Sequence, residues 1–218
     1  MRRNALQTRG RIVDAASRLF YGAGIGAVSV DAIAAKAGIT KRTLYYHFRS
    51  KDALIAAYLE ARDSPNLTTF VGWFEEASGQ LPARVEAIFT RLADSARHPK
   101  WRGCGILRTA AELVASPGHP ALKAGSNHKK NVESWLASVF ARNGAREPAA
   151  LARQIVLLID GAFSAMLLHR DAAYIAEAGR AAATLVAVHA GRRNAVGRRH
   201  RDGAVPNVFI VGPSTSTV

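Results

Sequence analysis

Apolar residues recur along most of the chain at spacings of three and four, which is the period of an amphipathic α-helix. In residues 9–21, for example, Ile12, Ala16 and Phe20 fall on one stripe. No long segment alternates apolar and polar positions, as a half-buried strand would. The pattern therefore predicts an all-α protein.

Capping residues, glycines and prolines predict where the helices begin and end. Ser29, Thr40 and Ser50 are N-cap candidates, and Gly38 suits a left-handed turn between two short helices. The helix after Ser50 is predicted to stop at about residue 63, because Pro65 would interrupt it. Further helices are expected at residues 82–96, 104–115, 120–143, 148–169 and 172–190.

These elements divide the chain into three parts. Residues 1–50 form a predicted three-helix head, and residues 51–191 form a helical bundle for effector binding and dimerisation. The helices at 148–169 and 172–190 are apolar on more than one face, so we expect them to form a homodimer interface. Residues 192–218 are predicted to be a basic flexible tail.

Charge favours a polyanionic partner, with nucleic acid ahead of an anionic membrane. The net charge is +14, of which +7 falls in residues 1–62 and +4 in the tail, so the bundle is nearly balanced. A single cysteine excludes an internal disulfide. The N-terminus has no secretory signal, and the apolar segment 155–168 is too short for a membrane span and contains Asp160. We therefore expect a cytoplasmic protein with no membrane partner.

The two short helices around Gly38 have the spacing of a helix-turn-helix motif. Gly38 makes the sharp turn, and Ile39, Leu44 and Phe48 fill the shared core. The rest of the second helix then faces outward and offers cations, hydroxyls and aromatic rings that suit a major groove. Its outward residues are Lys41, Arg42, Thr43, Tyr45, Tyr46 and His47.

Residues at the start of a recognition helix read bases most often, so Lys41, Arg42 and Tyr45 are the first candidates for base contacts. The helical wheel leaves open whether Tyr45 or Tyr46 reads bases. Thr40 caps the helix and is a further candidate contact. An ordinary helical hairpin, with its aromatic side chains in the core, is the alternative interpretation of this segment.

The segment SVDAIAAKAGITKRTLYYHFRSKDAL resembles the N-terminal signature of the TetR/AcrR family of bacterial repressors, over about residues 11–59. The resemblance implies a homodimer that binds a palindromic DNA operator and is released by a small-molecule effector. It also implies that His47 donates to phosphate and is not a catalytic base. By the same resemblance, the phosphate contacts would be Ser29, Thr43, Tyr46, His47 and Lys51.

Two later segments, RGCGILRTAAEL at 102–113 and LLIDGAFSAMLL at 157–168, resemble one broad subgroup of that family. The subgroup often carries a larger residue where this chain has Gly105, which implies a changed pocket lining. No cofactor is expected. Effector candidates are apolar residues mixed with a few polar ones: Trp73, Phe74, Phe89, Leu92, Cys104, Leu107, Glu112, His128, Trp135 and Phe163.

Other interpretations of these residues stay open. Cys104 is either a thiol sensor or a small buried hydrophobe. His98, His119 and His128 lack close metal-ligand spacing, so we expect solvated histidines and no metal site. The arginines of the tail either add nonspecific affinity for DNA or lipid or are solvated; they are Arg192, Arg193, Arg198, Arg199 and Arg201.

Two rival functions remain beside the regulator. An architectural protein would bind DNA without regard to its sequence. A helical enzyme would need a nucleophile and a base, for which Cys104 and His128 are the available pair. No Ser/His/Asp signature is present in the sequence, so we predict no catalytic residues and no enzyme.

Overall fold

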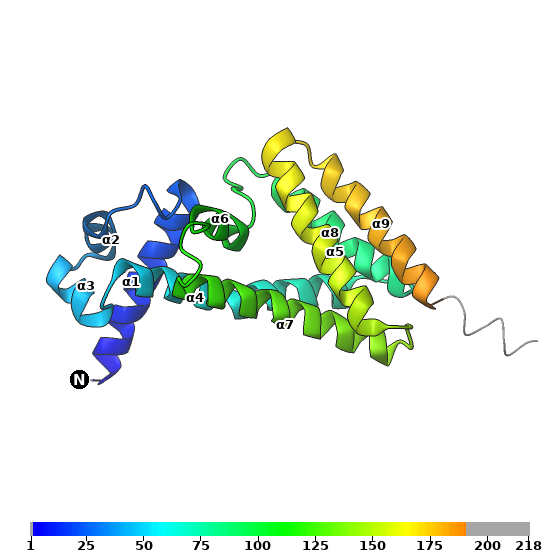
Figure 1. Cartoon of the computed structure of the whole chain (residues 1–218), viewed down its shortest axis with the longest axis horizontal. Coiled ribbons are helices and arrows are strands. Elements are labelled where there is room, and N and C mark those ends of the chain that lie inside the picture. Colours follow the sequence, from blue (N-terminus) through cyan, green and yellow to red (C-terminus); the bar gives the residue numbers. More distant parts are fainter. Residues whose placement is uncertain (1, 191–218) are drawn as a thin grey trace, which may run out of the picture.

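The computed structural model describes residues 2–190, which form α-helices without strands, as the sequence predicts. Helices α1–α3 form a head at one end, α4 and α7 run along the middle, and α5, α8 and α9 pack at the other end (Figure 1). The predictions for the tail lie outside the described residues. The helices are α1 (Arg2–Ala23), α2 (Val30–Ala37), α3 (Lys41–His47), α4 (Lys51–Glu76), α5 (Leu81–Ala96), α6 (Gly105–Glu112), α7 (Pro120–Arg142), α8 (Pro148–His169) and α9 (Ala173–Ala190).

The predicted N-caps of the head are confirmed. Ser29 Oγ accepts from Ala32 N at 3.1 Å and Thr40 Oγ1 accepts from Thr43 N at 3.1 Å, so each hydroxyl satisfies an amide of the first helical turn. Gly38 has φ of 64°, the left-handed conformation that glycine adopts without strain. The turn between α2 and α3 is therefore fixed locally by Gly38 and Thr40, and the start of α2 by Ser29.

The core of the head continues beyond residue 50. Ile12, Phe20 and Leu44 are buried in one cluster with Leu54 and Tyr58 from the first half of α4. The same cluster includes residues from α6 and α7. The head is therefore packed onto the rest of the chain through shared apolar burial, which is the main stabilising term in such contacts.

Helix α4 is the main departure from the predicted elements. It does not stop before Pro65 but continues to Glu76, with Pro65 inside the helix. An interior proline costs about 3 kcal/mol or more because it removes one hydrogen bond and crowds the preceding turn. The second half of α4 offsets that cost by packing along α7 and α5, where Phe74 is buried.

The bundle core is formed by apolar residues from α5, α7, α8 and α9, together with Phe74. Helix α8 is 22 residues long, and by length and hydropathy alone it is apolar enough to cross a membrane, as core helices of soluble proteins also are. Its buried residues, such as Ile155 and Ile159, pack against α7 and α9. Those contacts account for its apolar character within the bundle.

Helices α5 and α9 cross closely at Gly179, and this contact is sensitive to one added methyl group. A Cβ at Gly179 would lie 2.7 Å from Cβ of Phe89, which is fully buried. We expect Gly179→Ala to lower the free energy of unfolding by about 1–3 kcal/mol in urea titrations at fixed protein concentration. Gly10→Ala, in open space on α1, is the control and should raise it by roughly 0.5–1 kcal/mol. Equal effects at both sites would contradict the close crossing.

Candidate nucleic-acid interface and ligand cavity

Helix α3 presents two distinct faces. Leu44 is fully buried and Phe48, just after the helix, is 4% exposed, whereas Tyr46 is 82% exposed and Tyr45 is 44% exposed. The guanidinium of Arg9 lies over the Phe48 ring at 4.8 Å and helps to close the core beneath the helix. The aromatic residues of this segment are thus divided between core and surface by the helical phase.

The cations of α3 differ in what already binds them. Lys41 Nζ donates to Asp31 Oδ2 at 2.9 Å, and this hydrogen bond and the carboxylate charge raise the pKa of Lys41. Arg42 is exposed and makes no hydrogen bond or ion pair within residues 2–190. Arg42 is therefore the cation of α3 that is free to bind an external acceptor.

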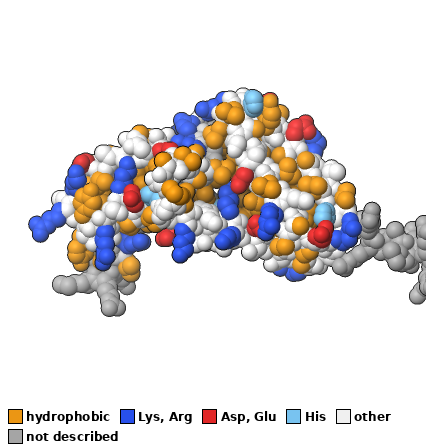
Figure 2. All heavy atoms as spheres, in the orientation of Figure 1, with side chains coloured by type: hydrophobic (Ala, Val, Ile, Leu, Met, Phe, Trp, Pro, Cys, Tyr) orange, Lys and Arg blue, Asp and Glu red, His pale blue; other side chains and the backbone are white. Residues whose placement is uncertain are grey.

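All nine residues predicted to contact DNA are exposed or partly exposed on the head. Ser29, Thr40 and Lys51 lie at the starts of α2, α3 and α4, where free backbone amides favour anions. Tyr46 packs edge-on against His47, with ring centroids 5.2 Å apart. Figure 2 shows basic side chains spread over the visible surface of the head.

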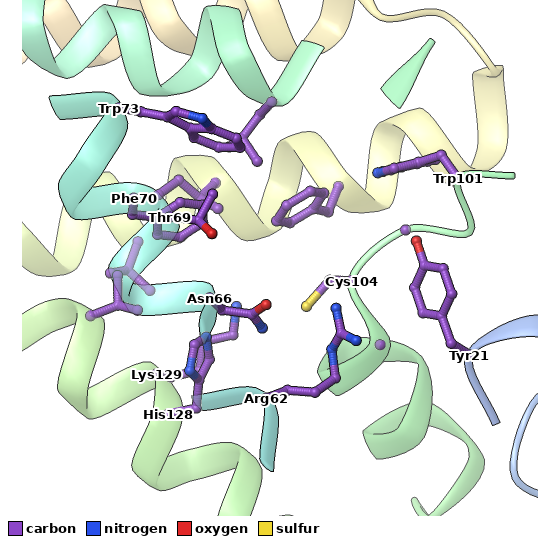
Figure 3. A pocket seen from close by; sticks show the side chains of 17 residues that line it. Tyr21, Arg62, Asn66, Thr69, Phe70, Trp73, Trp101, Cys104, His128 and Lys129 are labelled. Atoms are coloured by element: carbon purple, nitrogen blue, oxygen red, sulfur yellow. The ribbon is translucent and has the colours of Figure 1, made fainter. Parts of the chain in front are cut away.

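A cavity of about 220 Å³ lies between α4, α7 and α8 and the loop that leads into α6. Its apolar side is formed by aromatic rings: Trp101 stacks on Phe163 with centroids 6.2 Å apart, and Phe70 lies 5.8 Å from Trp73. Its polar side carries Arg62 and other side chains of α4 and α7 (Figure 3). The cavity also reaches α1 of the head, because Tyr21 lines it.

Half of the predicted effector residues line this cavity: Trp73, Leu92, Cys104, His128 and Phe163. The structure places the others elsewhere. Phe74 packs edge-on against Trp135 at 5.9 Å and Phe89 is fully buried, so these three belong to the bundle core. Leu107 lines a separate, shallower pocket, and Glu112 contacts the head.

Three of the lining residues that sequence analysis missed come from the second half of α4. Asn66, Thr69 and Phe70 line the cavity only because α4 continues past Pro65. Tyr21 and Arg62 were missed because nothing local joins the end of α1 to α4. Phe70 and Trp73 are three residues apart, which places both rings on one face of a helix. This spacing is the sequence signal that could have predicted the continuation of α4 past Pro65.

The expectation of solvated histidines was wrong for two of the three. His128 is 4% exposed, and its Nδ1 donates to Asp63 Oδ1 at 2.8 Å, the tautomer that the carboxylate requires. His119 caps α7 by accepting from Ala121 N, and its side chain is also buried. Within residues 2–190, no group of three potential ligands is arranged to hold a metal ion.

Gly105 is explained by the packing of α4 against α6. A Cβ at Gly105 would lie 2.5 Å from Oη of Tyr58, a residue that is 1% exposed. Burial also raises the pKa of Tyr58, so its hydroxyl stays neutral. The Tyr58 side chain of α4 therefore occupies the space that a side chain at residue 105 would need.

Helix α6 joins the cavity to the head. Cys104 and Gly105 at its start line the cavity, and Glu112 at its end accepts from Ile25 N at 3.2 Å and from Gly26 N at 2.8 Å. We call this pair of hydrogen bonds the Glu112 clasp. Between the two ends, Arg108 donates to the carbonyl oxygen of Tyr21 at 2.8 Å.

Cys104 and His128 line the same cavity, but no hydrogen bond joins them in the described part of the chain, and Asp63 already binds the Nδ1 of His128. Figure 3 shows the Arg62 side chain reaching toward Cys104 from α4. The arrangement therefore supplies a mixed polar and aromatic binding surface without a nucleophile–base contact.

Comparisons with known proteins agree on one family. Residues 12–58 match the family model for bacterial regulatory proteins of the tetR family. A TetR-family transcriptional regulator from Streptomyces coelicolor is 32% identical, with a TM-score of 0.70, over 84% of this chain and 96% of its own. A putative TetR transcriptional regulator from Streptomyces avermitilis is 30% identical, with a TM-score of 0.71, over 84% of this chain and 98% of its own.

Similarity to curated proteins covers part of the chain. The HTH-type transcriptional regulator SrpR of Pseudomonas putida is 41% identical over 61 residues, which is 28% of this chain and 29% of SrpR. The chain matches less than half the length of such curated relatives. These curated relatives are described as HTH-type transcriptional regulators, which agrees with the helix-turn-helix of the head.

The buried His128 predicts a pH dependence of stability. Burial lowers the pKa of His128 below 6.5, although the hydrogen bond from its ring to Asp63 opposes the shift. The unfolded chain therefore takes up this proton first as the pH falls, so the free energy of unfolding decreases below about pH 6.5. His128→Asn should make that decrease smaller, whereas His98→Asn, at an exposed site, should not. Parallel profiles for all three proteins in chemical denaturation between pH 5 and 8 would contradict this assignment.

Proposed function

Because the chain belongs to the TetR family of bacterial transcriptional regulators, we propose that it is a ligand-responsive repressor that binds a palindromic operator as a homodimer. The observation that carries the proposal is the two-faced α3, with Leu44 buried and Arg42 and Tyr46 exposed. The cavity in the same chain supports a role for a small-molecule effector.

In this proposal α3 enters the major groove. Seven residues at about 1.5 Å each give a helix ~10 Å long, which fits a groove about 12 Å wide. Arg42 pairs with a base edge, and Tyr45 or Tyr46 contacts bases or backbone beside it. Ser29, Thr40, Thr43, His47 and Lys51 bind phosphates, and Lys41 adds charge while it stays paired with Asp31.

Dimerisation through α8 and α9 is supported by their exposed apolar side chains. Leu157 is 66% exposed, Leu168 is 80% exposed and Val188 is 59% exposed, and Tyr174 is also exposed. A second copy of the same two helices would remove these side chains from water. Two heads held in this way would meet successive major grooves about 34–36 Å apart.

The proposed switch runs through α6. An effector in the cavity would press on Cys104 and Gly105, and a rigid helix of eight residues would carry the displacement to the Glu112 clasp. The clasp then sets the direction of the head, and hence the spacing of the two recognition helices. The first half of α4, which shares the core of the head, would move with it.

A regulator of this kind acts in the cytoplasm, where its DNA is, and needs neither a cofactor nor a catalytic residue. The regulator family to which the chain belongs is not enzymatic. The rival that experiments must exclude is an architectural protein that binds any duplex. The two differ in the ratio of affinities for operator and for random DNA.

Measuring that ratio tests the proposal. Duplexes selected from a random library should yield a palindrome, and the palindrome should bind about a thousandfold or more tighter than a scrambled duplex at the same salt concentration. A ratio near one would leave only the architectural function.

Two substitutions should separate base reading from phosphate binding. Arg42→Ala is expected to cost about 1–3 kcal/mol of operator affinity and to relax specificity at one base position in each half-site. Lys51→Ala should weaken all duplexes alike and reduce the slope of affinity against salt concentration. Binding assays against single-base operator variants check both outcomes. Uniform weakening by Arg42→Ala would instead place Arg42 on the phosphate backbone.

Loss of the Glu112 clasp should weaken binding to a full palindromic operator but not to a single half-site. Glu112→Ala should leave each head free to change direction, so affinity for the full palindrome should fall by roughly 5–150-fold, the usual range of coupling between sites. Affinity for a duplex with one half-site should be unchanged, because the contacts within one head are intact. Glu75→Ala on α4 is the control, since Glu75 is exposed and makes no hydrogen bond within residues 2–190. Equal losses on both duplexes would mean that the clasp only stabilises the head.

A further inference from the structure

One basic side chain of the cavity has no acidic partner in the described residues. The guanidinium of Arg62 makes no hydrogen bond or ion pair within residues 2–190, and the contact recorded for it is with the Tyr21 ring, 5.5 Å away. Arg62 lines the cavity and is only partly exposed, so it is shielded from bulk water on several sides. A partly buried guanidinium that lacks a carboxylate favours an incoming anion.

The other charged and titratable groups near the cavity already have partners. Lys129 is ion-paired with Asp160 of α8. Asp63 accepts from His128 and from Asn131 Nδ2, the latter at 2.6 Å. Burial keeps His128 neutral by lowering its pKa. Asp63 keeps its negative charge but does not line the cavity, so Arg62 is the lining cation without an ion-pair partner in residues 2–190.

The remainder of the lining favours a flat apolar molecule. Figure 3 shows Trp73 and Phe70 on one side and Trp101 on another. Trp101 also stacks on Phe163, so an aromatic ring meets ring faces and edges. The cavity, at about 220 Å³, lies just below the usual range of small-molecule sites, which favours a compact ligand. A hydrophobic body and one anionic group is the combination that this lining recognises.

We propose that the cavity binds an aromatic carboxylic acid, with its carboxylate paired to the guanidinium of Arg62 and its ring held between the aromatic side chains. The planar guanidinium offers two parallel N–H donors to a carboxylate, which lysine does not. The proposal rests on the function proposed above, in that it names the chemistry of the effector for the same cavity.

The ligand would also compete for a contact with the head. Arg62 lies over Tyr21, whose hydroxyl accepts from Arg102 N at 3.0 Å and whose carbonyl accepts from Arg108. A carboxylate that binds Arg62 would remove its contact with Tyr21. Tyr21 lies near the end of α1, where Arg108 of α6 contacts the head. Binding at Arg62 is thus placed at the start of the proposed switch.

The test compares two probes that differ in charge and hardly in shape, 2-naphthoate and 2-naphthamide. Their binding to the full chain is measured by calorimetry and by quenching of tryptophan fluorescence. The wild-type protein is expected to bind 2-naphthoate at least about tenfold tighter than the amide, as a charge-assisted pair implies. Arg62→Met should abolish that preference, while Arg142→Met, an exposed arginine on α7, should keep it.

Three results would overturn the proposal: equal or tighter binding of the amide, an acid preference that persists in Arg62→Met, or no binding of either probe at millimolar concentration. Thermal unfolding and operator binding show whether Arg62→Met is folded. If it is not, Arg62→Gln takes its place and should lose the same preference.

The outcome is separable from that of the proposed function, because the probe titrations contain no DNA. Arg62-dependent binding of 2-naphthoate supports the proposed ligand class, whether or not the protein binds a specific operator. Release of operator DNA by 2-naphthoate is a second measurement, and its failure beside Arg62-dependent binding would count against the effector-controlled switch alone.

Discussion

The two hydrogen bonds of the Glu112 clasp are the interaction on which the account of this molecule depends. They join the end of α6 to Ile25 and Gly26, between α1 and α2, across more than eighty residues of sequence. The start of the same helix is a wall of the cavity. Helix α6 has only eight residues, about 12 Å, so it joins the cavity to the head over a short distance. In the function proposed above, this helix carries a displacement from the cavity to the head, supported by the core that α1 shares with α4.

Charge has different roles in the two halves of the chain. In the head the charged side chains are largely exposed, as at Arg42. Exposed cations of this kind can pair with the phosphates of a polyanion. At the cavity Lys129 is paired with Asp160, whereas Arg62 has no ion-pair partner in residues 2–190. The net charge of +14 therefore indicates a polyanionic partner for the head but does not indicate the chemistry of the proposed effector. The ligand's chemistry becomes visible only when the partner of each charged group is known.

The head could be predicted almost completely because its signals are local. Ser29, Gly38 and Thr40 fix the helix ends through contacts within four residues. The cavity could be predicted only in part, because packing overrides local preference: α4 continues through Pro65 to bury Phe74. Burial of His128 and the contact of Glu112 with the head likewise depend on residues distant in sequence. The alanine-rich helical period predicts a bundle, but it does not predict which faces of the helices pack against each other.

The central claim is that α6 sets the direction of the heads, and the distance between the two heads of the dimer tests it most directly. Asp14 is exposed on α1, so a spin label attached at Asp14→Cys in a Cys104→Ser background would report that distance by double electron–electron resonance. The account predicts one narrow distance distribution, which becomes broad when Glu112 is replaced by alanine. An identical narrow distribution in both proteins would contradict it, because the heads would then be held without the clasp.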